Sequence, residues 1–555
     1  MPIYTLKFDN FSYFYIITDK LFAVIIFYIQ KYKFISTETE GQIMDYNIET
    51  ENIRSLLPMG CESVQTVIDS DIIVPDIKDD INYIIDCSAK AVITEENILD
   101  GRIGFKGRLD LQIIYCCMEG KTCTLKSFMP FEDFIISDGI SSGDFAMLSP
   151  TVEKTECRMI NSRKAYVKCI VSVKAFIQAM NDTSVSANIN GEDLHIKYTP
   201  VSFKETSQSV NDTFRISEDL HLPQSKKAID DILFLEESVL DVDMKAVDGG
   251  IKVSGTTKLR IIYTSADDDE TDCVNFEIPL DGFTEGRNIH ENDIVCGKIY
   301  IKKCAVDIFT DNEGNDRGIS AQIDYSITAE AFSEKTINIS QDAYSGKVCT
   351  NTTQKEFSYP VFVGRNRNEI SLKEKFKTDG DEIMRLIGAW GNISYCDAQA
   401  GENSITINAI ADISILCLSK SDSTPYISIR RSVPFSREAE LIGCAKNDYV
   451  CVTSQITDIQ VNVLNNSEAE ADIRILFDIC VQKIKNEMCI EKTEECAEQT
   501  DTPSAAIYIV QKGDTLWDIS KKYRTGEESI ALLNTLENNE IHEGQKILIM
   551  KKVNL

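Results

Sequence analysis

A chain of 555 residues is long enough for about three or four domains of ordinary size, and its 43% hydrophobic and 26% charged residues are typical of a globular protein. The 57 Lys and Arg residues against 88 Asp and Glu residues give a net charge of -31, which would repel nucleic acid and anionic lipid. A basic or neutral partner is therefore expected, and nucleic acid is not.

The first 43 residues contain a hydrophobic stretch, FSYFYIITDKLFAVIIFYIQKYKF. Asp19 and Lys20 interrupt it, and the longest uncharged run, at 21–30, is too short to cross a bilayer. A basic start and a small-residue cleavage site, which a signal peptide needs, are not evident. The favoured interpretation, given below, therefore contains no integral membrane segment. Three interpretations stay open: a membrane anchor, a buried hydrophobic helix, or upstream DNA translated as protein.

The codons before Met44 favour the third interpretation. Glu40-Gly41 must be encoded by a purine run that resembles a bacterial ribosome-binding site, and it lies two codons before Met44. The Phe, Tyr, Ile and Lys richness of the leader is also what AT-rich noncoding DNA gives when it is translated. We expect residues 1–43 to be a non-native upstream extension or a poorly ordered hydrophobic leader, with the native start at Met44.

The next part of the chain contains internal repeats. The segment IIVPDIKDDINYIIDCSAKA at 72–91 is echoed by HLPQSKKAIDDILFLEESV at 221–239. One offset of 148 positions relates Pro75 to Pro223, Asp100-Gly101 to Asp248-Gly249, Gly107 to Gly255 and Tyr115 to Tyr263. An offset of 154 maps GTTKLRIIY at 255–263 onto AIADISILC at 409–417, a third copy that carries Lys377 in place of the proline.

Each copy is predicted to begin with a short helix and to continue as β structure. Ile77, Ile81, Ile84 and Ile85 recur at helical spacing after Pro75-Asp76, residues that suit the start of a helix. Apolar and polar residues then alternate at 108–115, 167–174 and 473–479, as in half-buried strands. The Asp-Gly pairs at 100–101 and 248–249 predict tight hairpin turns.

The predicted fold class is therefore α+β and predominantly antiparallel β. Three tandem β-rich modules are expected at 44–198, 199–345 and 346–485, each with one short helix covering a face. Three copies of one module present similar surfaces repeatedly, whereas an active site is usually one constellation in one place. The repeats thus favour a scaffold over an enzyme.

Neither the cysteines nor the histidines form a pattern of metal binding or catalysis. The 18 Cys residues contain no C-x-x-C pair, and the only adjacent two are Cys116 and Cys117, so metal knuckles are not expected. Thiols scattered through apolar runs favour reduced, structural cysteines in a cytosolic compartment. The four His residues lie far apart in the sequence and form no H-E-x-x-H motif. We predict no catalytic residue, metal or cofactor.

After the third copy, the acidic and polar segment at 486–506 is predicted to be a flexible linker. A compact pattern of strand, helix, helix and strand follows at 507–552. IYIV is a short strand, and Asp514 or Thr515 can cap a helix that carries Leu516, Ile519 and Tyr523 on one face. Thr525 and Glu528 suggest a capping box for a second helix, and Trp517 is assigned to the small core or its edge.

This pattern, YIVQKGDTLWDISKKY followed by LLN and GQKILI, resembles a LysM domain over nearly its whole length. LysM domains typically bind N-acetylglucosamine-containing glycans in a shallow groove. The resemblance places that groove between two sets of residues: Gly513, Asp514, Thr515 and Leu516 on one side, and Asn534, Thr535, Leu536 and Ile541 on the other.

The repeats themselves, which open with SVQTVIDSDIIVPDIKDDINYII, resemble the SPOCS domain of clostridial sporulation proteins. Three such modules before one LysM domain are similar to the spore-coat morphogenetic proteins of the SipL type. The resemblance implies a place in the mother-cell cytoplasm, on the forespore and spore-coat surface. It implies as partners the ATPase of the coat basement layer and other coat proteins, with the LysM domain as the docking module.

The sequence is compatible with three functional classes to different degrees. A non-enzymatic scaffold in spore-coat assembly accounts for the repeats, the cysteines and the lack of a catalytic set, and it is the favoured prediction. The alternative is a peptidoglycan-binding protein of the cell wall or cortex, which would need export, and a single LysM is expected to bind glycan weakly without avidity. A wall hydrolase would need a catalytic constellation that the sequence does not show. Self-association through the repeats is left open.

Overall fold

The computed structural model describes residues 46–268, 270–311, 314–378, 382–496, 503 and 505–550, and the backbone of two short strands near the N-terminus. Those strands, β1 (Tyr4–Phe8) and β2 (Phe11–Tyr15), pair antiparallel. They belong to a unit spanning Met1–Asp45, and the rest of the chain forms a second unit. The remainder of the predicted leader at 1–43 lies outside the described residues. None of the helices described is long and apolar enough to traverse a bilayer.

The second unit begins with six antiparallel strands that form two three-stranded sheets. The inner strand of one sheet is β8, flanked by β3 and β7, and the inner strand of the other is β5, flanked by β4 and β6. The bounds are β3 (Asn47–Ile73), β4 (Ile81–Leu99), β5 (Arg102–Cys117), β6 (Thr122–Ile136), β7 (Phe145–Asn161) and β8 (Lys164–Asn190). One hydrophobic cluster, which includes Leu111, Tyr115 and Val171, fills the space between the sheets.

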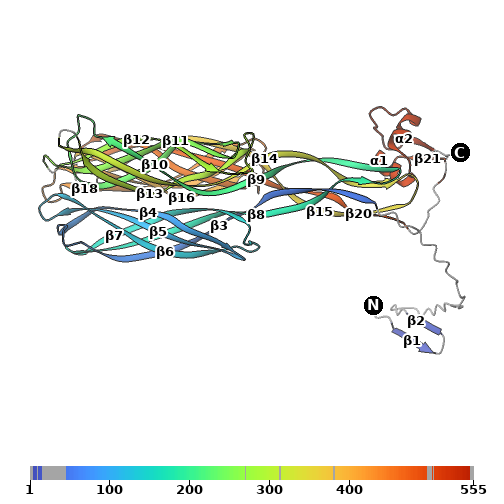
Figure 1. The fold of residues 1–555 in the computed structure, drawn as a ribbon, viewed down its shortest axis with the longest axis horizontal. Helices are drawn as coiled ribbons and strands as arrows, with labels where there is room; N and C mark the ends of the chain where they lie inside the picture. Colours follow the sequence, from blue (N-terminus) through green and yellow to red (C-terminus); the bar gives the residue numbers. More distant parts are fainter. Residues whose placement is uncertain are drawn as a thin grey trace. The chain divides into compact units, whose positions relative to one another are not determined.

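The same strand topology occurs twice more. The second repeat contains β9 (Leu194–His221), β10 (Ile229–Val247), β11 (Gly250–Ser265), β12 (Thr271–Glu285), β13 (Ile294–Thr310) and β14 (Asp316–Ser345). The third contains β15 (Thr350–Lys377), β16 (Ile383–Ala400), β17 (Ser404–Ser419), β18 (Tyr426–Glu440), β19 (Tyr449–Asn465) and β20 (Glu468–Glu495). Each repeat has its own core. Figure 1 shows β8, β14, β15 and β20 continuing beyond the shorter strands.

Strand register relates the three copies residue by residue. Ile84 pairs with Tyr115, Ile232 with Tyr263 and Leu386 with Cys417, and a register shift follows each of these pairs. The sequence offsets of 148 and 154 therefore match equivalent positions in the sheets. The Asp-Gly pairs at 100–101 and 248–249 form the predicted hairpin turns, with Gly101 at φ 79° and Gly249 at φ 88°, a backbone region that favours glycine.

The three repeats pack around a common axis. Equivalent residues of β5, β11 and β17 meet there in one hydrophobic cluster: Ile114, Ile262 and Leu416. Residues of β4, β10 and β16 join it, namely Ile85, Leu233 and Ile387. Since these side chains are buried by neighbouring copies, the repeats share a core and are not structurally independent domains.

Farther along the axis, the long strands of the three repeats form a second shared core. It contains Val185, Ile337 and Cys489, which are equivalent positions of β8, β14 and β20. The neighbouring strands β3, β9 and β15 contribute Ile53, Phe203 and Phe357 to the same cluster. The long strands thus bury apolar side chains well beyond the two-sheet repeats.

The short helix predicted at the start of each repeat is not found among the residues that the structure describes, and for the first repeat the prediction is wrong. Residues 74–80 form a turn, Ile77 is 92% exposed, and Ile81 begins strand β4. Arg163 holds this turn by donating to the carbonyl oxygens of Val74, Pro75 and Lys78. The helical spacing of the isoleucines has another cause. Ile81 packs in the core of the first repeat, whereas Ile85 packs in the cluster on the common axis. A register shift in β4 lies between these two residues, so both faces of the strand carry isoleucine.

Strand bounds also differ from the predicted domain boundaries. The boundary predicted at 198/199 lies within β9, and the one at 485/486 lies within β20. We propose junctions between repeats at 191–193 and 346–349, where strands end and begin. Residues 486–495, predicted as linker, pair with β15 as the end of β20.

One disulfide corrects the prediction that all cysteines are reduced. Cys349 and Cys496 are bonded just outside the paired ends of β15 and β20, with 5.1 Å between their Cα atoms. They are 147 positions apart in the sequence, so no local pattern could reveal the pair. The other sixteen cysteines are free thiols.

The C-terminal domain has the predicted order of strand, helix, helix and strand. β21 (Ala505–Ile509) pairs with β22 (Lys546–Met550), and α1 (Leu516–Tyr523) and α2 (Glu527–Asn534) lie between them. Its core contains Leu516, Ile519, Ile530, Ile547 and Ile549. The capping box predicted for α2 is wrong: Gly526 is the N-cap residue, and Thr525 is buried.

Candidate functional site

The first side of the candidate groove is the turn before α1. Gly513 has φ 95°, and Asp514 accepts hydrogen bonds from the Gln511 amide and the Tyr508 hydroxyl, each at 2.8 Å. These bonds hold the pKa of Asp514 below its usual value. The carboxylate therefore shapes the turn and stays charged near neutral pH.

Thr515 and Leu516 of the predicted set serve mainly in the structure of α1. Thr515 is the N-cap, and its hydroxyl accepts from the Asp518 amide at 3.2 Å while the Asp518 carboxylate accepts from the Thr515 amide. Leu516 is 5% exposed and belongs to the core. Of these two, Thr515 is the exposed residue.

The second side of the groove follows α2. The Asn534 side chain bonds to the main chain of Leu548 in both directions, at 2.7 Å, so it ties α2 to β22. Thr535 is exposed with φ 50°, whereas Leu536 and Ile541 are half-buried against the core. Gly513, Thr515 and Thr535 are thus the predicted residues most open to a partner.

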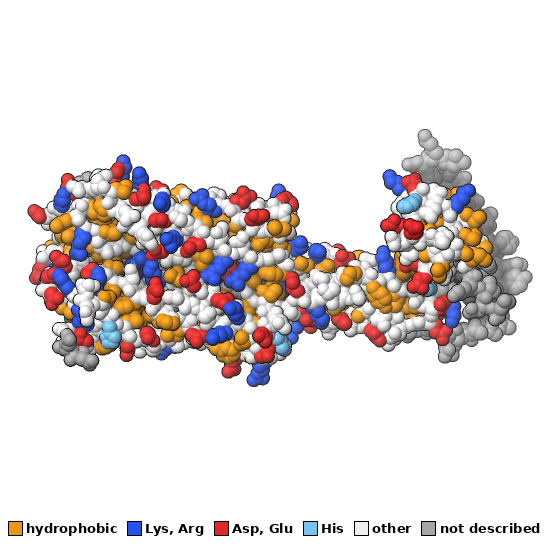
Figure 2. All heavy atoms as spheres, turned by 90° about the horizontal axis from the view of Figure 1, so that it is seen from above, with side chains coloured by type: hydrophobic (Ala, Val, Ile, Leu, Met, Phe, Trp, Pro, Cys, Tyr) orange, Lys and Arg blue, Asp and Glu red, His pale blue; other side chains and the backbone are white. Residues whose placement is uncertain are grey.

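Acidic side chains surround this groove. Glu537, Glu540 and Glu543 are exposed in the loop between α2 and β22, and Asp514 lies in the turn opposite. On the face of the chain seen in Figure 2, acidic and basic side chains are interspersed over the repeats. The residues predicted to form the groove therefore lie in an acidic part of the domain.

A different face of the LysM-like domain contacts the repeats. Asp342 of β14 accepts from the Trp517 indole at 2.8 Å and from the Lys521 ammonium at 2.7 Å. The Tyr344 hydroxyl donates to the Thr525 carbonyl oxygen at 2.8 Å, and its ring meets the Trp517 ring edge to face. Trp517 therefore lies at the edge of its domain, and none of these contacts uses a predicted groove residue.

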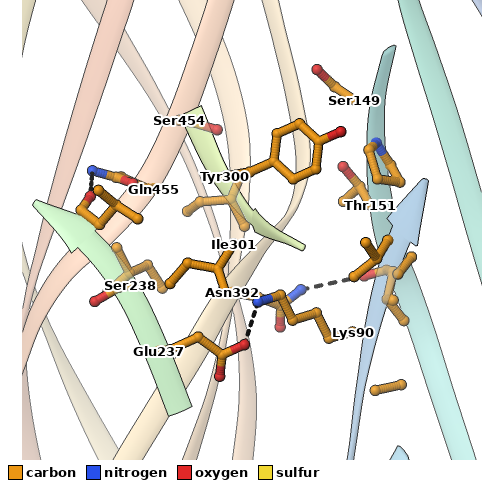
Figure 3. A pocket seen from close by; sticks show the side chains of 18 of the residues that line it. Lys90, Ser149, Thr151, Glu237, Ser238, Tyr300, Ile301, Asn392, Ser454 and Gln455 are labelled. Atoms are coloured by element: carbon orange, nitrogen blue, oxygen red, sulfur yellow. Dashed lines mark hydrogen bonds and ion pairs between the residues drawn. The ribbon is translucent and has the colours of Figure 1, made fainter. Parts of the chain in front are cut away.

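The repeats line a second candidate site, a partly open cavity of about 1490 Å³ with residues of all three copies in its wall. In Figure 3 the Lys90 side chain reaches Glu237, and the ion pair measures 2.5 Å. Across the same cavity, Gln455 donates to the Val239 carbonyl oxygen at 2.7 Å, and Asn392 to that of Val152 at 3.3 Å. Each of these bonds joins two different repeats.

Two ionisable groups around this cavity have shifted pKa values. Burial lowers the pKa of Lys298 to about 8, and its ammonium donates to the Ser149 hydroxyl at 2.8 Å. Burial raises the pKa of Glu236, which pairs with Arg260 at 2.9 Å. Since both groups bind partners in the wall, the cavity resembles an interface between repeats more than a reaction site.

The structure also brings together side chains that sequence reasoning left apart. Asp79, Cys117 and Cys123 offer three ligand atoms within 4.8 Å of one another, although no metal site was predicted. The spacing Cys-x5-Cys was the available signal, but the third residue comes from a turn 38 positions earlier in the chain than Cys117.

Comparison with protein families matches two domain types. The SipL SPOCS domain matches residues 80–160 and 228–309, and the LysM domain matches residues 508–549. The chain has the SPOCS and LysM domains of a SipL-type sporulation protein. The SPOCS matches cover β4 to β7 and β10 to β13, and the third repeat shares their topology without being matched. No curated protein matches the chain significantly.

These domains define the general character of the protein. SPOCS and LysM are binding or structural domains, and together they indicate a sporulation-related protein associated with the spore coat and of the peptidoglycan-binding kind.

Proposed function

We propose that this protein is a non-enzymatic scaffold of the bacterial endospore coat, which links the coat basement layer to the forespore surface through its LysM domain. Its partners would be the ATPase of the basement layer and other coat proteins, reached from the mother-cell cytoplasm. The observation that supports this most is the LysM domain attached by one face to the repeats, with the predicted groove left uncovered by those contacts.

An exposed apolar strip on the same domain favours a protein partner. Ile507 and Ile509 of β21 and Leu548 and Met550 of β22 are between 38% and 69% exposed. Together with the acidic groove, these residues offer a basic or neutral protein both apolar contact and charge complementarity.

The repeats suit a rigid support. Three copies bury a common core, so the LysM domain is carried by one large body whose modules are packed against one another. Sixteen of the eighteen cysteines are free thiols, as a reducing compartment such as the mother-cell cytoplasm would give, and Cys349–Cys496 is the one pair that is bonded.

The second candidate function is peptidoglycan binding through the same groove. The LysM match itself favours it. A single domain of this kind would gain affinity for glycan by avidity if several copies assemble.

One experiment distinguishes the two functions. The full chain is tested for retention on purified peptidoglycan and on the purified basement-layer ATPase. Thr535→Arg places a long cation in the groove, and Glu528→Arg, on an exposed position at the start of α2, introduces the same side chain outside it.

The scaffold proposal expects retention by the ATPase that Thr535→Arg reduces at least about tenfold, or about 1.4 kcal/mol, and that Glu528→Arg leaves unchanged. Groove-dependent retention on peptidoglycan alone would support the second function instead. If the two variants are retained equally on peptidoglycan and equally on the ATPase, the predicted groove is not the binding site for either ligand.

A further inference from the structure

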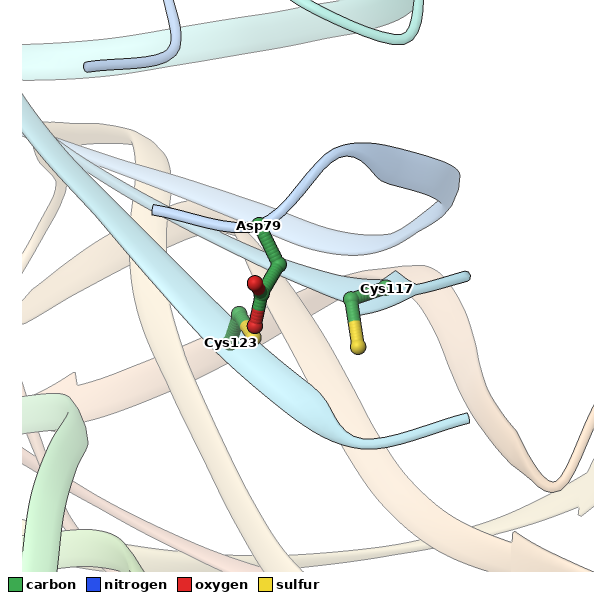
Figure 4. A group of neighbouring side chains, drawn as sticks. All are labelled: Asp79, Cys117 and Cys123. Carbon is green, nitrogen blue, oxygen red and sulfur yellow. The ribbon is translucent and has the colours of Figure 1, made fainter. Parts of the chain in front are cut away.

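A group of three potential metal ligands lies at one end of the first repeat. Cys117 ends β5, Cys123 lies near the start of β6, and Asp79 belongs to the turn before β4. Figure 4 shows the two thiols and the carboxylate side by side, and their ligand atoms lie within 4.8 Å of one another. Cys117 is fully buried, whereas Asp79 is exposed, so the group opens to solvent on one side.

The fold holds these three residues in place. The Tyr115 hydroxyl donates to the Asp79 carbonyl oxygen at 3.0 Å, and the Arg163 guanidinium donates to the carbonyl oxygens of Pro75 and Lys78. The Cys117 amide donates to the Lys121 carbonyl oxygen at 2.9 Å and closes the hairpin between β5 and β6. The carboxylate is therefore presented to the thiols by a turn that is fixed on both sides.

The equivalent positions of the second repeat carry residues of other types. Lys227 and Ser265 stand at the positions of Asp79 and Cys117, and Asp272, which pairs with Tyr263 as Cys123 pairs with Tyr115, replaces the second thiol. There Asp272 is neutralised by Lys226 at 2.8 Å.

In the first repeat, Lys78 is the equivalent of Lys226, but it forms its ion pair with a residue of the second repeat. Lys78 extends to Asp231 of the second repeat at 2.6 Å. The group of two thiols and one carboxylate thus lacks the direct ion pair that Asp272 makes in the second repeat.

We propose that Asp79, Cys117 and Cys123 bind a divalent cation of the zinc class, with solvent at the remaining position. Thiolate ligands select Zn²⁺ over Mg²⁺ and Ca²⁺, and three protein ligands with one open position are a common zinc arrangement. Binding displaces the proton of each thiol to solvent and fixes the turn at 74–80 against the hairpin.

The test uses the full chain and titration with Co²⁺ and Zn²⁺. We expect one site that shows sulfur-to-cobalt charge transfer, is displaced by Zn²⁺, and releases about two protons per ion at neutral pH because both thiols lose theirs. Cys117→Ser, Cys123→Ser and Asp79→Asn should each weaken binding by more than about 100-fold, since even outer partners of ligands cost roughly 10- to 100-fold.

Cys304→Ser, at a half-buried thiol of the second repeat, is the control and should bind as the parent chain does. Asp79 is exposed, so Asp79→Asn keeps the fold and tests the site even if a cysteine variant does not fold. Binding that survives Asp79→Asn and both serine variants overturns the proposal. A disulfide between Cys117 and Cys123 in protein isolated from cells overturns it as well.

Discussion

Asp342 makes two of the hydrogen bonds that join the LysM domain to the repeats. Burial by itself would raise the pKa of this carboxyl group, but hydrogen bonds from Lys521 and Trp517 outweigh burial and lower it. Because one carboxylate accepts from two side chains of α1, its charge strengthens the attachment of that helix to the repeats.

Removing this carboxylate should detach the domain. We expect Asp342→Ala to increase hydrogen exchange and iodide quenching at α1 and Trp517, while the six-stranded repeats keep their protection. Asp182→Ala, at an exposed aspartate of β8, is the matched control. Unchanged protection of α1 in Asp342→Ala would contradict the contact.

The same contact should depend on pH in one direction. The pKa of Asp342 is lowered from 3.8 in the folded chain, so its stabilisation is complete above pH 3.8 and is lost as pH falls through the lower folded value. Quenching of Trp517 should rise below pH 3.8 in the parent chain. In Asp342→Ala it should be high at all pH values, and a parallel rise there would assign the change to another group.

At the scale of elements, α1 depends on its cap. Thr515 and Asp518 satisfy each other's main-chain amides at the start of a helix of eight residues, too short to be stable alone.

Loss of this cap should cost about 1 kcal/mol of the stability of the LysM domain. We expect Thr515→Ala to lower the local unfolding free energy, as measured by hydrogen exchange at α1, and Thr515→Ser to preserve it. A ligand affinity that falls in Thr515→Ser as well as in Thr515→Ala would indicate that the threonine contacts the ligand in addition to capping.

On the scale of the whole molecule, three equivalent polar residues meet on the axis: Gln178, Glu330 and Gln482, each separated by 152 positions. Lys204 enters the same place, pairs with Glu330 and donates to Gln482 at 3.1 Å. The side chains of Lys204 and Glu330 are 0% and 2% exposed. Breaking such a pair leaves a buried charge without a partner.

Lys204→Ala should therefore destabilise the chain by about 3–5 kcal/mol. The double variant Lys204→Met with Glu330→Gln removes both charges and places Gln at all three equivalent positions, so we expect it to recover most of that loss. Urea unfolding measures both. A double variant as unstable as Lys204→Ala would show that the charges are not the cause.

The shared axis also predicts that damage in one repeat spreads to the others. Leu233 is fully buried in the cluster formed by all three copies. Leu233→Asp should reduce hydrogen-exchange protection in β5 and β17 as well as in β11. Ile77→Asp changes an isoleucine that is 92% exposed and should leave all three strands protected. Loss of protection confined to the second repeat would mean that the copies fold independently.

The sequence by itself determined the repeats, the hairpin turns, the alternating strands and the LysM pattern, because each depends on residues close together in the chain or on a constant offset. It did not determine whether residues 74–85 form a helix or a turn followed by a strand. A spacing of isoleucines that suits a helix also suits a strand that is buried on both faces. Only the tertiary structure decided which distant residues meet: Cys349 with Cys496, Asp342 with Trp517, and Asp79 with Cys117 and Cys123. The first contact follows from strand pairing within the third repeat, the second from the attachment of the LysM domain to β14, and the third from the fold of the first repeat, and no local pattern encodes any of them.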